Sequence, residues 1–300
     1  MEATLKKVLV LGGTRFFGKR LVHLLIESGA DVTVATRGLT EVDLPPQVKR
    51  LVVDRDDKAS LAIAGEEQWD IVYDNICYSY QNALDACEVF RGKVGKYVLT
   101  STLSVYDYAE QALKEEEFDP YTYPLRPGTR EGVSYQEGKR QAEAVFFQTD
   151  AFPVVAVRFP IVLAEEDYTR RLHFHVEHVH EEQPIGLENP QATMCFIHAG
   201  EAARFLQWAG TGSVTGPVNA NSHGTVTLQA LLDNIAQAVG KPARIQPETA
   251  PSDQSPFGFP HSFFMDNSKA AAAGFAFLTL ESWLPALIQT IAKETMHAKA

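Results

Sequence analysis

The chain has 300 residues, of which 45% are hydrophobic and 22% are charged, and its formal net charge is -11. This composition is typical of a globular protein with one large core, with or without a small accessory lobe. The negative charge argues against nucleic acid and anionic membranes as partners, because their phosphates would be repelled. No apolar run is long enough to span a bilayer, and a strand pattern begins at Lys7 with no signal peptide before it, so we expect a cytoplasmic protein.

The first 160 residues alternate short β-rich runs with helical patterns. The expected strands are 7–11, 31–35, 50–53, 70–74, 96–101 and 153–159. The helix between the first two strands has one apolar face, made by Phe17, Leu21, Leu24 and Leu25. Gly29 then ends that helix. Continuous apolar strands separated by helices predict a doubly wound parallel sheet that is covered on both faces, the α/β architecture of the Rossmann type.

The pattern after residue 160 is looser. The expected elements are a helix-like segment over 164–182, a helix at 199–209, a strand at 216–220, a helix at 227–239, a proline-rich loop at 245–262 and a last helix at about 280–295. We expect residues 1–163 to form the sheet domain and residues 164–300 to form mainly a smaller C-terminal substrate lobe. Elements near 196–222 are expected to return to the first sheet.

A glycine loop follows the first strand in "KVLVLGGTRFFGKR", residues 7–20. Gly12, Gly13 and Gly18 permit a tight turn and bring backbone N–H groups close to a pyrophosphate at the positive end of the next helix. Arg15 occupies the position where the middle glycine of such a loop usually falls. The loop predicts a dinucleotide site, and the alternative is a tight turn without a ligand.

The end of the second strand bears on the choice of cofactor. Enzymes that select NAD often carry an acid there, whereas this chain has "TRG" with Arg37. A guanidinium can pair with a 2′-phosphate, and Arg15 could approach the same phosphate from the loop. We therefore expect NADP, with NAD as the alternative; both arginines could instead be solvated surface residues. Asp54 and Arg55, after the third strand, are expected to bound the adenine.

A Tyr-x-x-x-Lys spacing, Tyr135 to Lys139, stands at the head of an amphipathic segment. On a helix both side chains share one face, so the ammonium group favours the tyrosinate form. This spacing often arises by chance, so its position in the sequence is the evidence for a catalytic role. The preceding strand ends in "YVLTSTLSVY", which places the hydroxyls of Ser101, Thr102 and Ser104 at the edge where open α/β sheets bind ligands.

The ordered motifs are GGTRFFG, DRDD, TSTLSVY, YQEGK, VRFPIVL, FIHAGEAARFL, VNANSHGTVTLQALL and DNSKAAAAGF. With them the chain resembles the extended short-chain dehydrogenase/reductases, the NAD(P)-dependent epimerase/dehydratase family. The resemblance implies that Tyr135 is the general acid/base, that Lys139 holds ribose and that Thr102 binds the reacting oxygen while hydride moves to or from a nicotinamide. Together with Tyr135 and Lys139, it implies cofactor contacts at Gly12, Thr14, Arg15, Phe16, Phe17, Gly18, Arg37, Asp54, Arg55, Asn75, Thr100 and Pro160.

Departures from the family pattern bear on the substrate. Dehydratases of this kind typically carry an Asp-Glu pair where this chain has Leu103 and Ser104, so we do not expect 4,6-dehydration. Ile161 and Met194 replace an asparagine and an arginine that lie near the diphosphate in many nucleotide-sugar enzymes, which argues against a nucleotide sugar. Three arginines could substitute for the lost phosphate contact: Arg126, Arg170 and Arg171.

Neither the cysteines nor the histidines are expected to hold a metal. The isolated cysteines are expected to be buried reduced thiols: Cys77, Cys87 and Cys195. The segment "RLHFHVEHVH" contains His173, His175, His178 and His180. On a helix, His173, Glu177 and His180 would share a face, which is a candidate metal site. We favour a packed or solvated helix, and one histidine touching substrate is a further alternative.

The expected function is hydride transfer at a secondary alcohol or ketone of a sugar-like small molecule. The GGTRF loop followed by TRG also resembles the chloroplast stem-loop RNA-binding branch of the superfamily, so RNA binding on the same scaffold is an alternative, against which the acidity argues. A dinucleotide sensor without turnover is another. The family resemblance also suggests a homodimer built on helices that include the Tyr135 helix.

Overall fold

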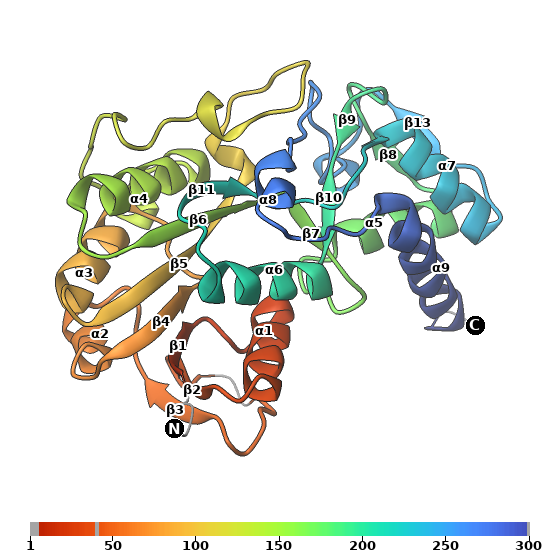
Figure 1. Cartoon of the computed structure of the whole chain (residues 1–300). Helices are drawn as coiled ribbons and strands as arrows, with labels where there is room; N and C mark the ends of the chain where they lie inside the picture. The colour runs from red at the N-terminus through yellow and green to blue at the C-terminus, as the bar shows by residue number, and fades with distance from the viewer. Residues whose placement is uncertain (1–5, 40–41, 299–300) are drawn as a thin grey trace.

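The computed structural model describes residues 6–39 and 42–298. Its centre is a seven-stranded parallel sheet in the order β11-β6-β5-β4-β1-β2-β3 (Figure 1). The strands are β1 (Lys7–Leu11), β2 (Asp31–Thr36), β3 (Lys49–Val52), β4 (Trp69–Asp74), β5 (Val94–Thr102), β6 (Val154–Phe159) and β11 (Gly216–Asn219). The strand order reverses between β1 and β4, which is the switch point of a doubly wound sheet. The predicted fold class and all six predicted N-terminal strands are confirmed.

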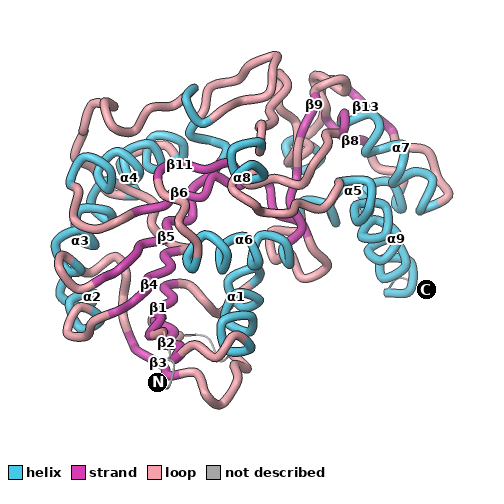
Figure 2. The backbone as a smooth tube through the Cα atoms, viewed as in Figure 1, coloured by secondary structure: helices cyan, strands magenta, loops and turns pink. Residues whose placement is uncertain are grey.

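Helices cover both faces of the sheet (Figure 2). One face carries α1 (Phe16–Glu27) and α6 (Ala199–Thr211), and the other carries α2 (Lys58–Ala64), α3 (Tyr80–Phe90) and α4 (Tyr135–Thr149). Alternate residues of β1 point to opposite layers: Val8 and Val10 pack with α1 and α6, whereas Leu9 and Leu11 pack with the other three helices. Because both faces are buried here, the strand is apolar at each of these four positions.

The chain returns to this sheet after leaving it. Strand β7 (Ile161–Leu163) pairs in parallel with β10 (Phe196–His198), α6 then packs against α1, and β11 pairs with β6. The segment from β10 to β11 is therefore hydrogen-bonded and packed against the N-terminal half. The division of the chain near residue 163 stays our interpretation.

The smaller lobe lies beyond β7 and β10. Three helices pack on one another there: α5 (Arg171–Glu181), α7 (Leu228–Val239) and α9 (Leu280–Ala298). Two small sheets complete it, β8 (Pro184–Gly186) with β13 (Arg244–Gln246), and β9 (Thr193–Met194) with β12 (Val226–Thr227). A short helix, α8 (Ser268–Ala272), precedes the last one. The expected helices at 199–209, 227–239 and 280–295 are confirmed within a few residues.

The prediction for 164–182 was wrong in its first third, because α5 begins only at Arg171. Before it, Oδ1 of Asp167 accepts hydrogen bonds from the backbone N–H and hydroxyl of Thr169, at 2.9 and 2.6 Å, and Arg170 has a left-handed φ of 52°. This side-chain turn replaces helical backbone bonds. The expected loop at 245–262 also contains the end of β13 and a 3₁₀ turn, Pro251–Asp253.

The three cysteines are free and buried, as expected, and burial raises the pKa of each thiol to about 12.

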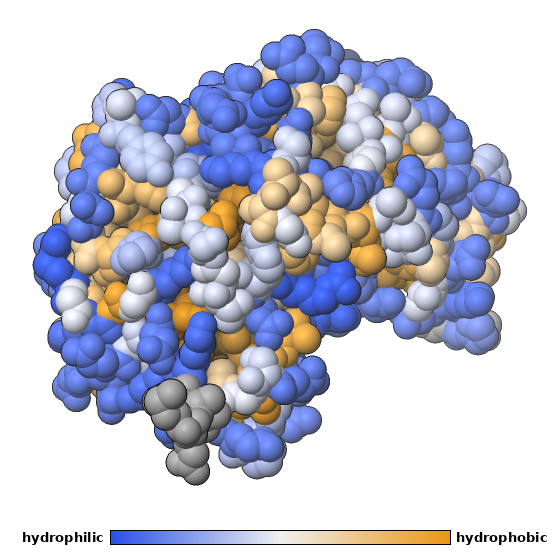
Figure 3. All heavy atoms as spheres, viewed as in Figure 1, coloured by the Kyte–Doolittle hydropathy of each residue, from blue (hydrophilic) through white to orange (hydrophobic). Residues whose placement is uncertain are grey.

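On the face drawn in Figure 3, hydrophilic side chains are spread widely, with apolar patches between them. In the part of the chain that the structure describes, no helix combines the length and apolarity needed to cross a membrane.

Candidate active site

A cleft of about 580 Å³ opens at the carboxyl ends of the central strands, next to the switch point between β1 and β4. This edge is where open α/β sheets bind ligands. Most of the predicted site residues line the cleft: Gly12, Thr14, Arg15, Phe16, Phe17, Gly18, Asn75, Thr100, Thr102, Tyr135, Lys139 and Pro160. The cleft also contains residues that the sequence did not single out for a site, among them Tyr78, Arg130, Asp167 and Tyr168.

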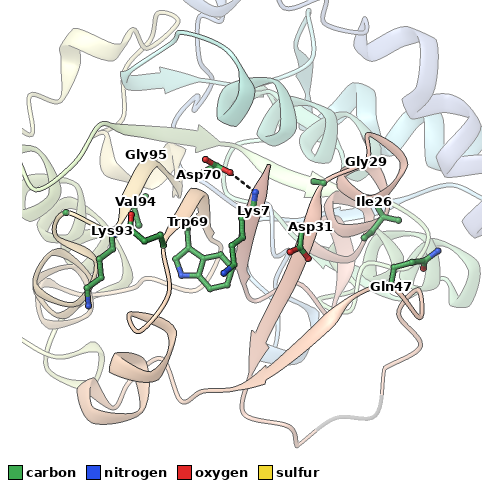
Figure 4. Close-up of a pocket in the computed structure, with 13 residues that line it drawn as sticks. Lys7, Ile26, Gly29, Asp31, Gln47, Trp69, Asp70, Lys93, Val94 and Gly95 are labelled. Carbon is green, nitrogen blue, oxygen red and sulfur yellow. Dashed lines mark hydrogen bonds between the residues drawn. The ribbon is translucent and has the colours of Figure 1, made fainter. Parts of the chain in front are cut away.

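A larger hollow, of about 1550 Å³, lies at the opposite, amino edge of the sheet (Figure 4). Several of its polar groups already have hydrogen-bond or ion-pair partners. The backbone N–H of Lys7 donates to Asp70 at 2.7 Å, Lys49 pairs with Asp31 at 2.7 Å, and the indole of Trp69 donates to a backbone carbonyl. Because these groups already have partners, we assign the functional site to the cleft at the carboxyl edge, although the hollow at the amino edge is larger.

The phosphate loop is built by close packing at the start of α1. A Cβ atom at Gly18 would lie 2.5 Å from the carbonyl oxygen of Gly12, so only glycine allows the helix to approach the loop this closely. Arg15 is the N-cap of α1, and its side chain makes no capping bond. The first N–H groups of the helix are therefore open to an anion, which the helix dipole also favours. The residues present fit a pyrophosphate.

Asn75 ties the phosphate loop to the next strands. Its Nδ2 donates to the Gly12 carbonyl at 3.3 Å, and its Oδ1 accepts from the Thr100 hydroxyl at 2.7 Å. Lys139, 2% exposed, reaches the same region from α4. Its Nζ donates to the carbonyl oxygens of Cys77 and Thr100, at 2.8 and 2.9 Å. The ends of β1, β4 and β5 are thus fixed relative to α4.

The three candidate catalytic residues border the same cleft. Tyr135 is the first residue of α4 and is 54% exposed; Nζ of Lys139 lies 6.0 Å from its ring centroid. Thr102 ends β5, and its Oγ1 accepts the backbone N–H of Ser104 at 3.1 Å. Because the oxygen acts as acceptor in that bond, the hydroxyl hydrogen stays available to a ligand. The Tyr-Lys spacing lies on a helix, as predicted.

The structure corrects the expectation for Arg55, which does not line the cleft. Arg55 is 3% exposed, and its Nε and Nη2 donate to Oδ2 of Asp74 at 3.0 and 2.9 Å. Nη2 also donates to the carbonyl of Asn82, and the hydroxyl of Tyr97 donates to the same Asp74 oxygen at 2.6 Å. Arg55 therefore neutralises a buried carboxylate at the end of β4 and is not among the residues that line the cleft.

Arg37 and Asp54 also lie outside the residues that line the cleft. Arg37 is exposed directly after β2, and Oδ1 of Asp54 accepts the backbone N–H of Asp56 at 3.0 Å. Arg15 does line the cleft, with its guanidinium carbon 5.9 Å from the ring centroid of Tyr168. The structure thus brings only one of the two expected phosphate-reading arginines into the cleft.

The three arginines considered as replacement phosphate contacts differ in position. Arg171 borders the cleft, Arg170 is paired with Glu177, and Arg126 is exposed outside the cleft lining. Ile161 and Met194 are part of the apolar wall.

The histidine-rich segment forms a packed helix, α5. His175 stacks on Phe257 with ring centroids 4.6 Å apart, and burial lowers its pKa to about 4. Its Nδ1 lies 2.8 Å from the carbonyl of Arg171, and its Nε2 lies 2.8 Å from the hydroxyl of Ser255. Glu177, the acidic residue of the less favoured metal-site alternative, is paired with Arg170. Among the described residues, no three His, Cys, Asp or Glu side chains are grouped to hold a metal ion.

Comparison with known sequences identifies the family. The sequence model of the NAD dependent epimerase/dehydratase family matches residues 8–220. The chain belongs to this family. The resemblance expected from the motifs is thereby confirmed.

Solved structures of this family share the fold. The NAD complex of UDP-glucose 4-epimerase from Thermus thermophilus is 21% identical, covers 97% of this chain and 99% of that one, and has a TM-score of 0.67. The NAD complex of dTDP-glucose 4,6-dehydratase from Bacillus anthracis is 17% identical, covers 96% of each chain and has a TM-score of 0.73. At these identities the likeness concerns the fold alone.

A curated relative has a different kind of name. The chloroplast stem-loop binding protein of 41 kDa b from Arabidopsis thaliana is 30% identical over 118 residues. The match covers 34% of this chain and 30% of the relative's length, so it concerns only part of each protein.

Proposed function

We propose that this family member moves hydride at a secondary alcohol or ketone of a sugar-like small molecule, with Tyr135 as general acid/base. The observation that carries the proposal is that Thr102, Tyr135 and Lys139 border the same cleft as the glycine loop. When bound, the nicotinamide dinucleotide supplies the hydride donor or acceptor. The protein supplies orientation and proton transfer.

In the described structure, each of the three side chains has a polar group available to a ligand. Lys139 uses two of its three N–H donors on backbone carbonyls, which leaves one for a ribose or substrate hydroxyl. Thr102 can donate its hydroxyl hydrogen to the reacting oxygen, and the exposed phenol of Tyr135 can take up or return the carbinol proton. These roles suit both epimerisation and simple oxidation or reduction.

We further propose that NADP is preferred to NAD. Arg15 in the cleft and the lack of an acid after β2 support a 2′-phosphate. The solved relatives named above contain NAD, which keeps NAD as the alternative.

The substrate side of the cleft supports two narrower proposals. Leu103 is 5% exposed and Ser104 carries no carboxyl group, so an acid/base pair for 4,6-dehydration is missing at these positions. Ile161, Val162 and Met194 line the cleft with apolar side chains, and the family resemblance implies that Ile161 and Met194 would lie near a diphosphate. We therefore propose a sugar-like substrate without a nucleotide. The homodimer and the cytoplasmic location stay predictions from the sequence.

Melting temperature in the presence of NAD⁺, NADH, NADP⁺ and NADPH tests the proposal. We expect at least one dinucleotide to raise the melting temperature, because a ligand that binds only the folded state stabilises it. The Tyr135→Phe variant should keep that shift and lose hydride transfer by roughly a hundredfold or more. Tyr121→Phe, at an equally exposed tyrosine (54%) outside the cleft lining, is the matched control. No shift with any dinucleotide would contradict the proposal.

RNA binding is the second candidate, favoured by the name of the Arabidopsis relative. The net charge of -11 argues against it. RNA affinity measured across a salt series separates the two functions, because phosphate contacts require affinity to fall as salt rises. A dinucleotide sensor, the third alternative, would bind cofactor and show the same cellular phenotype with Tyr135→Phe as with the native chain.

A further inference from the structure

Arg130 lies beside the candidate catalytic residues, on the ring of Tyr78. The guanidinium carbon of Arg130 is 4.4 Å from the centroid of that ring, and Nζ of Lys139 is 4.5 Å from the same centroid. The Tyr78 and Tyr135 rings are 6.3 Å apart. All four residues line the cleft. One aromatic ring thus holds a second cation next to the catalytic tyrosine and lysine.

The backbone fixes the position of this arginine. Arg130 begins a short 3₁₀ turn, Arg130–Gly132, that leads almost directly into α4. The preceding Gly128 carbonyl accepts the backbone N–H of Gln81, at the start of α3, at 3.1 Å. The segment is therefore attached to the helix that follows β4 and to the helix that carries Tyr135.

The charges of the cleft do not balance. The charged residues that line it are Arg15, Arg130, Lys139, Arg171 and one acid, Asp167. Asp167 uses Oδ1 in its own turn, and its Oδ2 is buried without a partner. Within the described ranges, no carboxylate forms an ion pair with Arg130. A cationic cleft in a chain with a net charge of -11 indicates an anionic ligand.

The phosphates of a bound dinucleotide would pair with only part of the positive charge that lines the cleft. Its pyrophosphate fits the N-terminus of α1 and the loop that contains Arg15. Arg130 belongs to a different wall, with Tyr78 and Tyr135. A guanidinium at that wall is suited to a carboxylate or phosphate oxygen, which it binds with two parallel hydrogen bonds.

We propose that Arg130 binds a carboxylate or phosphate group on the substrate, close to the carbinol carbon that reacts at Tyr135. This inference rests on the proposed function and names its substrate class, a sugar acid or a sugar phosphate. Tyr78 is the positioning residue that holds the guanidinium. The rest of the substrate packs against the apolar wall of Leu103, Met194, Phe259 and Phe263.

Binding of three small sugars to the cofactor-loaded protein tests the proposal. The protein is saturated with the dinucleotide that raises its melting temperature most, and D-glucuronate, D-glucose 6-phosphate and D-glucose are titrated by calorimetry. At least one of the two anionic sugars should bind about tenfold or more tightly than glucose, because the charge-assisted bond is made only by the anion. The anion that gains affinity distinguishes carboxylate from phosphate.

Two substitutions locate the effect. Arg130→Gln should abolish the preference for the anionic sugar and keep the melting-temperature shift with the dinucleotide, which shows that the variant is folded. Arg126→Gln removes the same charge from an exposed position of the same connecting segment and should keep the preference. Equal binding of all three sugars, no binding of either anion, or an unchanged preference in Arg130→Gln would overturn the inference. If no dinucleotide shifts the melting temperature, the proposed function itself has failed.

Discussion

Glu143 and Arg158 form an ion pair in the core behind the candidate catalytic residues, with Nη2 of the arginine 2.6 Å from Oε2 of the glutamate and both side chains 0% exposed. Ser101, next to Thr102, donates its hydroxyl hydrogen to Glu143, and Nη1 of Arg158 donates to the hydroxyl of Tyr106 at 2.8 Å. The pair therefore joins α4 to β5 and β6. It fixes the helix that carries the catalytic tyrosine relative to the strand that ends at Thr102.

Glu143→Gln should destabilise the protein strongly. The substitution leaves the Arg158 charge buried without its counter-ion, which typically costs about 3–5 kcal/mol of unfolding free energy. Urea denaturation measures the change. Glu166→Gln is the control, because Glu166 pairs with Arg20 at the surface, where such pairs contribute about 1 kcal/mol or less. Equal losses of unfolding free energy in the two variants would show that the buried pair stabilises the protein no more than the surface pair does.

Gly138→Ala should also destabilise the protein, although alanine is the better helix former by about 1 kcal/mol. An added Cβ at Gly138 would lie 2.3 Å from the backbone oxygen of Tyr78, so α4 would have to move away from the end of β4. We expect a lower melting temperature and a smaller stabilisation by the dinucleotide. Gly132→Ala has no neighbour closer than 4.0 Å and should change neither. A neutral Gly138→Ala would mean that this close approach is not required.

Arg15→Gln should weaken NADP binding more than NAD binding. A guanidinium bound to a 2′-phosphate contributes about 1.5–3 kcal/mol, which corresponds to roughly 10- to 150-fold in the dissociation constant, and NAD lacks that phosphate. Calorimetric titration of both dinucleotides gives the two constants. Arg204→Gln, at an exposed arginine of α6 outside the cleft lining, controls for the loss of one charge. Equal weakening of both dinucleotides would assign Arg15 to the pyrophosphate instead.

The sequence was informative where a residue's environment is set by its own strand or helix. The runs that became β1 and β6 are apolar at successive positions because both faces of the sheet are covered there, so they could be recognised without tertiary information. Lys139 follows Tyr135 on the same helix, and their shared face could be inferred from spacing alone.

Contacts between distant segments could not be inferred in this way. The position after β3 suggested a cofactor contact for Arg55, but its partner Asp74 comes from another strand, and the buried carboxylate attracts the arginine away from the cleft. The ring of Tyr168 packs against Phe16, next to the phosphate loop. Tyr168 lies inside the turn between Asp167 and Thr169, which precedes α5. The signal for that turn was the Asp-x-Thr spacing, which the charged pattern of the segment obscured.

His175 gives the protein a defined sensitivity to acid. Its Nδ1–H donates to the carbonyl of Arg171, so Nε2 accepts the hydroxyl hydrogen of Ser255. Protonation would remove that acceptor and place a charge against the Phe257 ring in the core. Burial is the main cause of the low pKa, and the neighbouring His178 lowers it further.

Because the pKa of His175 is about 4 in the folded protein and near 6.5 when unfolded, the unfolded chain binds the additional proton between these values. The contribution of neutral His175 to the free energy of unfolding is therefore fully present above about pH 6.5 and is lost as the pH falls toward 4. The loss between pH 7 and pH 5 is about 2 kcal/mol. Urea denaturation at both pH values should show that His175→Gln loses about that much less stability on acidification than the native chain. His297→Gln, at an exposed histidine of α9, should keep the native acid sensitivity. The same pH dependence in His175→Gln and the native chain would mean that other groups cause the acid response.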